Sequence, residues 1–73
     1  MATYNIYRDA WDSDAKEYIP TRAKTYDDVQ QFINDVNKYA NLKGHDNWLI
    51  VRELVLNETG GMDYFYRGVS KKN

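Results

Sequence analysis

The residues of this chain that could carry out nucleophilic catalysis are few and far apart. The sequence has no cysteine, one histidine, His45, and two serines, Ser13 and Ser70. Nucleophilic catalysis requires a hydroxyl or thiol beside a base, which a third group orients. No such triad can be assembled here, and among eleven acidic residues no pair stands out for general acid and base work. We therefore expect a protein without enzymatic activity.

Metal and cofactor chemistry is also weakly represented. Asp9, Asp12 and Asp14 crowd one polar segment, and closely spaced carboxylates are what Ca²⁺ or Mg²⁺ requires. The segment lacks the glycine and the distal glutamate of an EF-hand loop, so we interpret it as a solvated turn. His45 follows the end of a predicted helix, where an exposed imidazole complements the helix dipole, and without cysteine it makes no zinc site. We predict no metal ion and no cofactor.

Two short motifs have simple structural interpretations. Gly60-Gly61 is not followed by the lysine and helix of a phosphate-binding loop, and we expect it to form a hairpin turn. Asn57-Glu58-Thr59 matches the acceptor pattern for N-glycosylation, but no secretory signal is recognisable, so we interpret it as a chance match. No apolar run approaches the roughly 18 residues of a membrane span. We expect a soluble, cytoplasmic protein that does not bind membranes.

Length and charge limit the function classes further. Seventy-three residues form one domain, residues 1–73, too small for a catalytic cleft between two domains. Ten Lys and Arg residues against eleven Asp and Glu residues give a formal charge of −1. There is no global polycation to hold nucleic acid or an anionic membrane.

Hydrophobic patterning predicts four strands. Residues 3–8 alternate as a strand, residues 12–15 form a polar turn, and residues 17–24 return as a second strand. Pro20 has no N–H to donate, which places this second strand at a sheet edge. Residues 48–56 are rich in β-branched and aromatic side chains, and residues 62–67 follow the turn as their hairpin partner.

Between the two strand pairs the sequence predicts one amphipathic helix. Thr25 is placed to cap its free N–H groups, with Asp27 and Asp28 in the first turn, where the helix dipole favours negative charge. Lys43 and Gly44 are typical of a helix C-terminus, where a cation lies in the last turn and a glycine adopts the left-handed conformation that ends the helix. Six apolar side chains recur at the spacing of a single helical face: Val29, Phe32, Ile33, Val36, Tyr39 and Ala40.

The resulting order is strand, strand, helix, strand, strand, an α+β fold. We expect an antiparallel sheet with the helix packed on one face. One amphipathic helix covers one face of a sheet, so the other face meets water or a partner.

The strand at residues 48–56 does not alternate cleanly and carries apolar side chains on both faces. Burial on both faces requires a cover on each side, which one helix does not provide. A bulge at Arg52-Glu53 would instead switch the phase midway and turn one apolar set toward the helix throughout. Both interpretations remain open from the sequence.

The last strand suggests an aromatic surface. If Phe65 lies under the helix, then Tyr64 and Tyr66 lie on the other face, with Tyr7 and one of Trp48 and Leu49 beside them. Several such rings expose a large apolar area, and Tyr and Trp are enriched at binding hot spots. The alternative is that the rings lie flat on a solvated face.

We therefore expect a non-catalytic protein-binding module that blocks a partner's site sterically. Its partner-binding residues would be Tyr7, Trp48, Tyr64 and Tyr66 as apolar anchors, with Arg52 and Arg67 for polar specificity. In size, acidity, lack of cysteine and abundance of tyrosine, the chain resembles in kind the small phage- or mobile-element-encoded proteins that inhibit a host or defence enzyme, such as anti-CRISPR proteins.

Two other functions use the same rings. A single-stranded nucleic-acid binder would add the cations of Arg67, Lys71 and Lys72 to Tyr64 and Tyr66. A homodimer would bury the tyrosine face against itself. The first predicts binding that weakens steeply with salt, and the second predicts a species of twice the mass.

Overall fold

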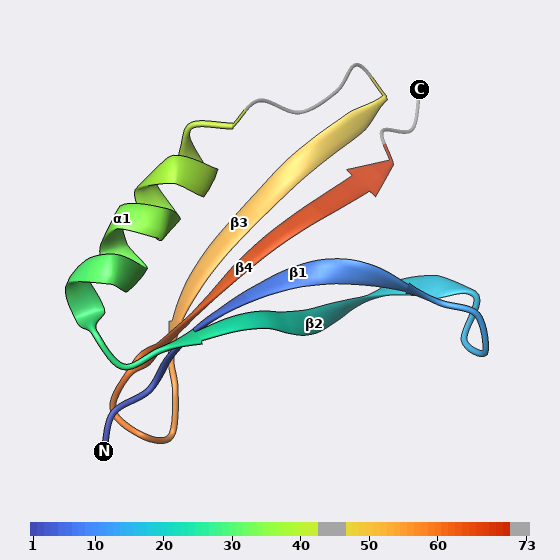
Figure 1. The fold of residues 1–73 in the computed structure, drawn as a ribbon. Helices are drawn as coiled ribbons and strands as arrows, with labels where there is room; N and C mark the ends of the chain where they lie inside the picture. The colour runs from blue at the N-terminus through green and yellow to red at the C-terminus, as the bar shows by residue number, and fades with distance from the viewer. Residues whose placement is uncertain (43–46, 71–73) are drawn as a thin grey trace.

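The computed structural model describes residues 1–42 and 47–70 of the chain. The elements are β1 (Tyr4–Asp12), β2 (Glu17–Tyr26), α1 (Val29–Ala40), β3 (Trp48–Leu56) and β4 (Met62–Ser70) (Figure 1). The predicted α+β order is confirmed. The bounds of β3 agree with the prediction, whereas β1, β2 and β4 continue beyond their predicted ends.

The four strands form one sheet in the order β2-β1-β4-β3. β1 with β2 and β3 with β4 are antiparallel hairpins, but β1 and β4 pair in parallel at the centre. The prediction of an antiparallel sheet is wrong at this pair. The reason is the connection through α1, which returns the chain so that β3 runs in the same direction as β2. Pro20 lies on β2, and the prediction that this strand forms an edge is confirmed.

The helix begins later than predicted. The N-cap residue is Asp28, whose side chain accepts a hydrogen bond from the Gln30 N–H at 3.0 Å. Thr25 was the wrong cap because β2 continues through Tyr26, and the Thr25 hydroxyl donates to the Asn5 side-chain oxygen at 2.8 Å. The helix ends at Ala40, with Asn41 as its C-cap residue and Lys38 in the last turn, so the predicted C-terminal end is too late in the sequence. Lys43 and Gly44 themselves lie outside the described residues.

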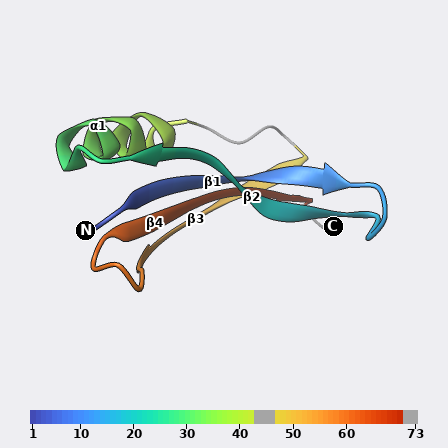
Figure 2. The same cartoon turned by 60° about the horizontal axis from the view of Figure 1, so that its bottom comes forward.

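The core is small and aromatic. Its buried members are Ile6, Tyr26, Phe32 and Tyr64, one from each of β1, β2, α1 and β4. The Phe32 ring lies 5.4 Å from that of Tyr4 and 5.8 Å from that of Tyr26, measured between ring centroids. Figure 2 shows α1 on one face of the sheet, with no other described element on the opposite face. The core therefore lies between α1 and one face of the sheet.

A hydrogen bond between Tyr26 and Asp35 links β2 to α1. The Tyr26 hydroxyl donates to an Asp35 carboxylate oxygen. Burial, together with this hydrogen bond, raises the pKa of Tyr26 far above its ordinary value. The folded protein therefore keeps the phenol proton at a pH where the unfolded chain, with a tyrosine pKa of about 10, releases it.

This pKa shift predicts a loss of stability in alkali. The stabilisation from Tyr26 is fully present below pH about 10 and is lost as the pH rises beyond that value. Tyr26→Phe should be less stable than the parent at pH 7 by about 1 kcal/mol, and the gap should narrow above pH about 10. Urea unfolding at a series of pH values measures this. A difference in the free energy of unfolding between the parent and Tyr26→Phe that stays constant up to pH about 11.5 would contradict the expectation.

Candidate partner-binding surface

The strand register determines which side chains share a face. Ile6 on β1 lies opposite Tyr64 on β4, and both are buried in the core beside α1. Side chains alternate along a strand, so Tyr66 shares this helix side, whereas Tyr7 and Phe65 face away from α1. The expected arrangement, with Phe65 under the helix and Tyr64 and Tyr66 outside it, is wrong.

Tyr64 and Tyr66 belong to the packing between helix and sheet. Tyr64 is 4% exposed, and burial raises the pKa of its hydroxyl. Tyr66 packs against Tyr39 of α1 with ring centroids 5.4 Å apart. The charges of Asp63 and Arg67, which share a face with Phe65, were the local signal that Phe65 lies away from the helix, and the prediction did not use it. The parallel register with Ile6 decides which set is covered.

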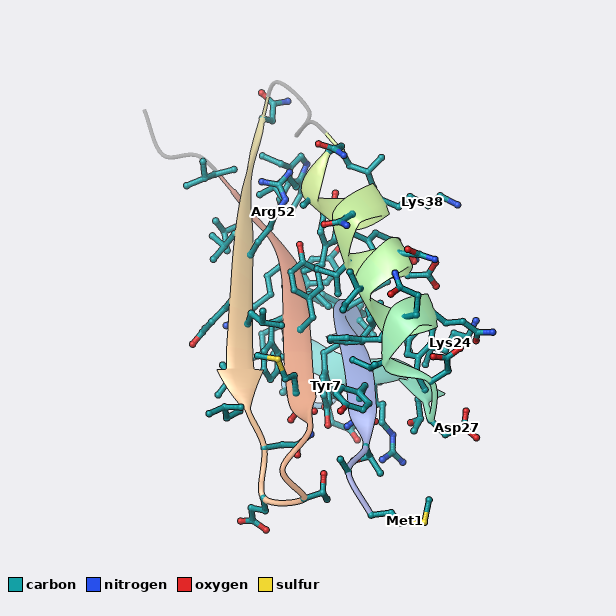
Figure 3. The ribbon with its side chains drawn as sticks, turned by 90° about the vertical axis from the view of Figure 1, so that its left-hand side faces the viewer. Met1, Tyr7, Lys24, Asp27, Lys38 and Arg52 are labelled. Atoms are coloured by element: carbon teal, nitrogen blue, oxygen red, sulfur yellow. The ribbon has the colours of Figure 1, made fainter. Side chains whose placement is uncertain are left out.

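Arg52 lies between β3 and the C-terminal end of α1 (Figure 3). Its guanidinium donates to the backbone carbonyls of Tyr39 and Leu42, and it lies 5.8 Å from the centroid of the Tyr66 ring. A cation at this end complements the helix dipole and satisfies carbonyls left without partners inside the helix. Arg52 thus connects β3 to α1, a role that its sequence position did not reveal.

The face of the sheet opposite α1 is called here the open face. At its centre the Tyr7 ring stacks on the Phe65 ring, with centroids 4.7 Å apart and an interplanar angle of 18°. Four exposed aliphatic residues of β3 and β4 share this face: Leu49, Val51, Val55 and Val69. Of the predicted aromatic anchors, Tyr7 lies on this surface, but its partner is Phe65 instead of Tyr64 or Tyr66.

Polar groups lie among the apolar side chains of the open face. The Arg67 Nε atom lies 3.3 Å from the Asp9 Oδ1 atom, the one ion pair among residues 1–42 and 47–70. Arg67 is therefore on the predicted surface but already has a partner within the chain. Along β4 it lies between Phe65 and Val69, and Glu53 of β3 lies opposite Phe65. Near the β3–β4 turn, Asn5 is buried and donates to Asp63 at 2.8 Å. The open face therefore combines apolar and charged side chains, as protein interfaces do.

Trp48 does not join this surface. By register it lies on the helix side of β3, where its ring is near Gly68. Its ring also meets Tyr18 edge-on at 6.2 Å, and Tyr18 meets Trp11 at 5.2 Å. The predicted binding residues thus fall into three places: the open face, the packing beneath α1, and this aromatic contact between β3 and the β1–β2 hairpin.

β3 has no bulge. Its pairing with β4 is unbroken from Trp48 to Leu56, so of the two interpretations left open the bulge at Arg52-Glu53 is excluded. The register shift lies instead between β1 and β2, at Ile6 and Tyr7. β3 therefore presents apolar side chains on both faces, interrupted at Arg52 and Glu53, and most of them are exposed.

The β3–β4 turn contains an open hollow of about 390 Å³, lined by Thr3, Asn5, Leu56, Asp63 and residues 57–59. Asn57 organises it. Its side-chain nitrogen donates to the Thr3 carbonyl and to Asp63, and its side-chain oxygen accepts from the Thr59 and Gly61 N–H groups. The nitrogen that glycosylation would modify is thus engaged within the fold, which supports a structural reading of the Asn57-Glu58-Thr59 motif.

Two of the three carboxylates near the first turn, those of Asp9 and Asp12, have structural partners. Asp12 accepts from the Asp14 N–H at 2.9 Å, and Asp9 is paired with Arg67. Within residues 1–42 and 47–70, no three His, Asp or Glu side chains are grouped so that they could hold a metal ion. His45 lies outside the described residues.

In the part of the chain that the structure describes, no helix has the length and apolar character to cross a membrane. No protein-family model, no curated protein and no solved structure matches this chain.

Proposed function

We propose that this protein is a non-catalytic binding module that contacts another protein through its open face. The observation that carries the proposal is the exposure of four aliphatic residues around the Tyr7–Phe65 stack: Leu49, Val51, Val55 and Val69. Exposed apolar side chains gathered on one face of a small protein mark an interaction surface. The charged groups among them, Glu53, Asp63 and the Asp9–Arg67 pair, would set the orientation of the partner.

The mechanism that fits this surface is steric occlusion. The open face extends across the four-stranded sheet, so it suits contact with a surface of similar size better than enclosure of a small molecule. The module would act by covering a site on its partner. Inhibition of a host or defence enzyme remains a prediction from size and composition.

A charge placed on the open face tests the proposal. Val51→Lys, and separately Val69→Lys, should reduce capture of the partner at least tenfold, because a lysine would be desolvated against an apolar surface. The side chains of Val51 and Val69 are 38% and 37% exposed, so both variants should fold. The measurement is affinity capture with the tagged protein from its native cell, quantified by mass spectrometry.

Val29→Lys is the matched control. Val29 is 44% exposed and lies on α1, on the opposite side of the sheet from the open face. It should leave both capture and the circular dichroism spectrum unchanged. Equal capture by the parent, Val51→Lys and Val69→Lys would contradict binding through this face.

The rival functions have their own readouts. The nucleic-acid hypothesis relied on the rings of Tyr64 and Tyr66, which lie on the helix side, and on Lys71 and Lys72, which lie outside the described residues. It predicts a gel shift that disappears between about 50 and 200 mM salt. The homodimer predicts a dimer in sedimentation that Val51→Lys dissociates.

A further inference from the structure

β3 is an edge strand with an unusual composition. It has a neighbour, β4, on one side only. Its nine residues contain no proline, glycine or lysine, and apolar side chains are exposed on both of its faces. Leu54 and Leu56 are exposed on the helix side, and Val51 and Val55 on the open face. An extended segment pairing with this edge would cover apolar side chains on both faces at once.

The opposite edge, β2, is protected in the ways that natural sheets use. Pro20 removes one N–H, and Arg22 and Lys24 add charge. β3 carries charge only at Arg52 and Glu53, and the Arg52 guanidinium is held by the carbonyls at the end of α1. The two edges therefore differ, and β3 is the one available for strand addition.

Glu53 defines what such a strand must carry. Its exposed side chain lies on the open face, opposite Phe65 and between Val51 and Val55 along the strand. Within the described residues its carboxylate makes no ion pair. Opposite charges directly across two strands are stabilising, and like charges are destabilising.

A second copy of this chain satisfies that requirement poorly. In a symmetric antiparallel pair, the residue on the two-fold axis faces its own counterpart. Full overlap of Trp48–Leu56 places Arg52 against Arg52. Moving the two-fold axis by one residue toward the C-terminus places Glu53 against Glu53. Moving it by one residue toward the N-terminus leaves Val55 and Leu56 outside the paired region.

We propose that the β3 edge binds an extended segment of the partner protein as a fifth strand, with a basic side chain of that segment opposite Glu53 and apolar side chains two positions to either side. This rests on the proposed function, because it names the part of the partner that extends the open-face contact. Main-chain hydrogen bonds would supply affinity, and the Glu53 carboxylate would select the register.

Two synthetic peptides test the inference directly. Both have nine residues alternating between Val and Thr, capped at each end, with either Lys or Glu at the central position in place of Val. Titrated into ¹⁵N-labelled protein, the Lys peptide should bind about threefold more tightly than the Glu peptide. It should shift amide resonances within Trp48–Leu56 more than those of β2.

Glu53→Lys should reverse this preference, so that the Glu peptide binds about threefold more tightly. Glu17→Lys makes the same change of charge on β2 at the other edge and should leave the parent preference intact. Equal affinity for both peptides in the parent, an unchanged preference in Glu53→Lys, or a dimer that forms through β3 would each overturn the inference.

The failure of this inference can be separated from failure of the proposed function. Val69 lies on β4 opposite Leu49, so Val69→Lys alters the open face while the unpaired edge of β3 keeps its own residues. If Val69→Lys loses the captured partner while neither peptide binds β3, the open-face function stands and the edge inference is overturned.

Discussion

Gly61→Ala is expected to lower the free energy of unfolding by about 3 kcal/mol. A Cβ atom at this position would lie 1.7 Å from the Thr3 carbonyl oxygen and 2.6 Å from the Thr3 carbonyl carbon. These are main-chain atoms, so relief requires the start of β1 and the start of β4 to separate. The Met62 N–H donates to the same Thr3 oxygen at 3.2 Å, so the substitution disturbs the junction between the two hairpins.

Gly60→Ala is the control for Gly61→Ala. Gly60 has φ of 85°, which a side chain adopts only with strain, but a Cβ atom there would have no neighbour within 4 Å. We expect a loss of about 1 to 2 kcal/mol from backbone strain alone. Urea unfolding followed by circular dichroism measures both variants. A Gly61→Ala variant no less stable than Gly60→Ala would show that Thr3 does not restrict this position.

Phe32→Ala is expected to lower the free energy of unfolding by about 4 kcal/mol. Phe32 is 2% exposed, and its ring packs against those of Tyr4 and Tyr26. Few other buried side chains are available to fill the cavity in so small a core. A domain of this length has a total stability of roughly 4 to 11 kcal/mol, so this variant should lose between about a third and all of its stability.

Ile33→Ala removes an aliphatic side chain from the adjacent helix position. Ile33 is 42% exposed, so its loss leaves no enclosed cavity, and we expect a change of at most about 1 kcal/mol. Thermal unfolding of the two variants gives the comparison. Equal melting temperatures would mean that Phe32 is not the centre of the core.

Predictions from the sequence succeeded where one local signal decided the outcome. The apolar spacing from Val29 to Ala40 identified the helix, and Pro20 identified an edge strand. The helix start was misplaced because Thr25, Asp27 and Asp28 are all acceptable N-caps, and the continuation of β2 through Tyr26 selects Asp28.

The candidate surface was less predictable because it depends on non-local pairing. Within residues 62–67 the charges of Asp63 and Arg67 share the face of Phe65, which favours Met62, Tyr64 and Tyr66 as the set that faces the helix, but the prediction weighed the aromatic rings alone. The parallel pairing of Ile6 with Tyr64 determines which set of side chains the helix covers. No single segment of the sequence specifies the order of the strands. Similarly, Arg52 appeared to be a free surface cation until its contact with the end of α1 was visible.

The central position of the first and last strands has a consequence for folding kinetics. Each hairpin closes over a short loop, whereas β1 meets β4 through pairs such as Tyr4 with Met62, which are 62 − 4 = 58 positions apart. Closing a loop of that length carries an entropic penalty of about 3.6 kcal/mol beyond the constant term. The two hairpins should therefore form rapidly and independently, and their docking should be the slow step that sets the folding rate.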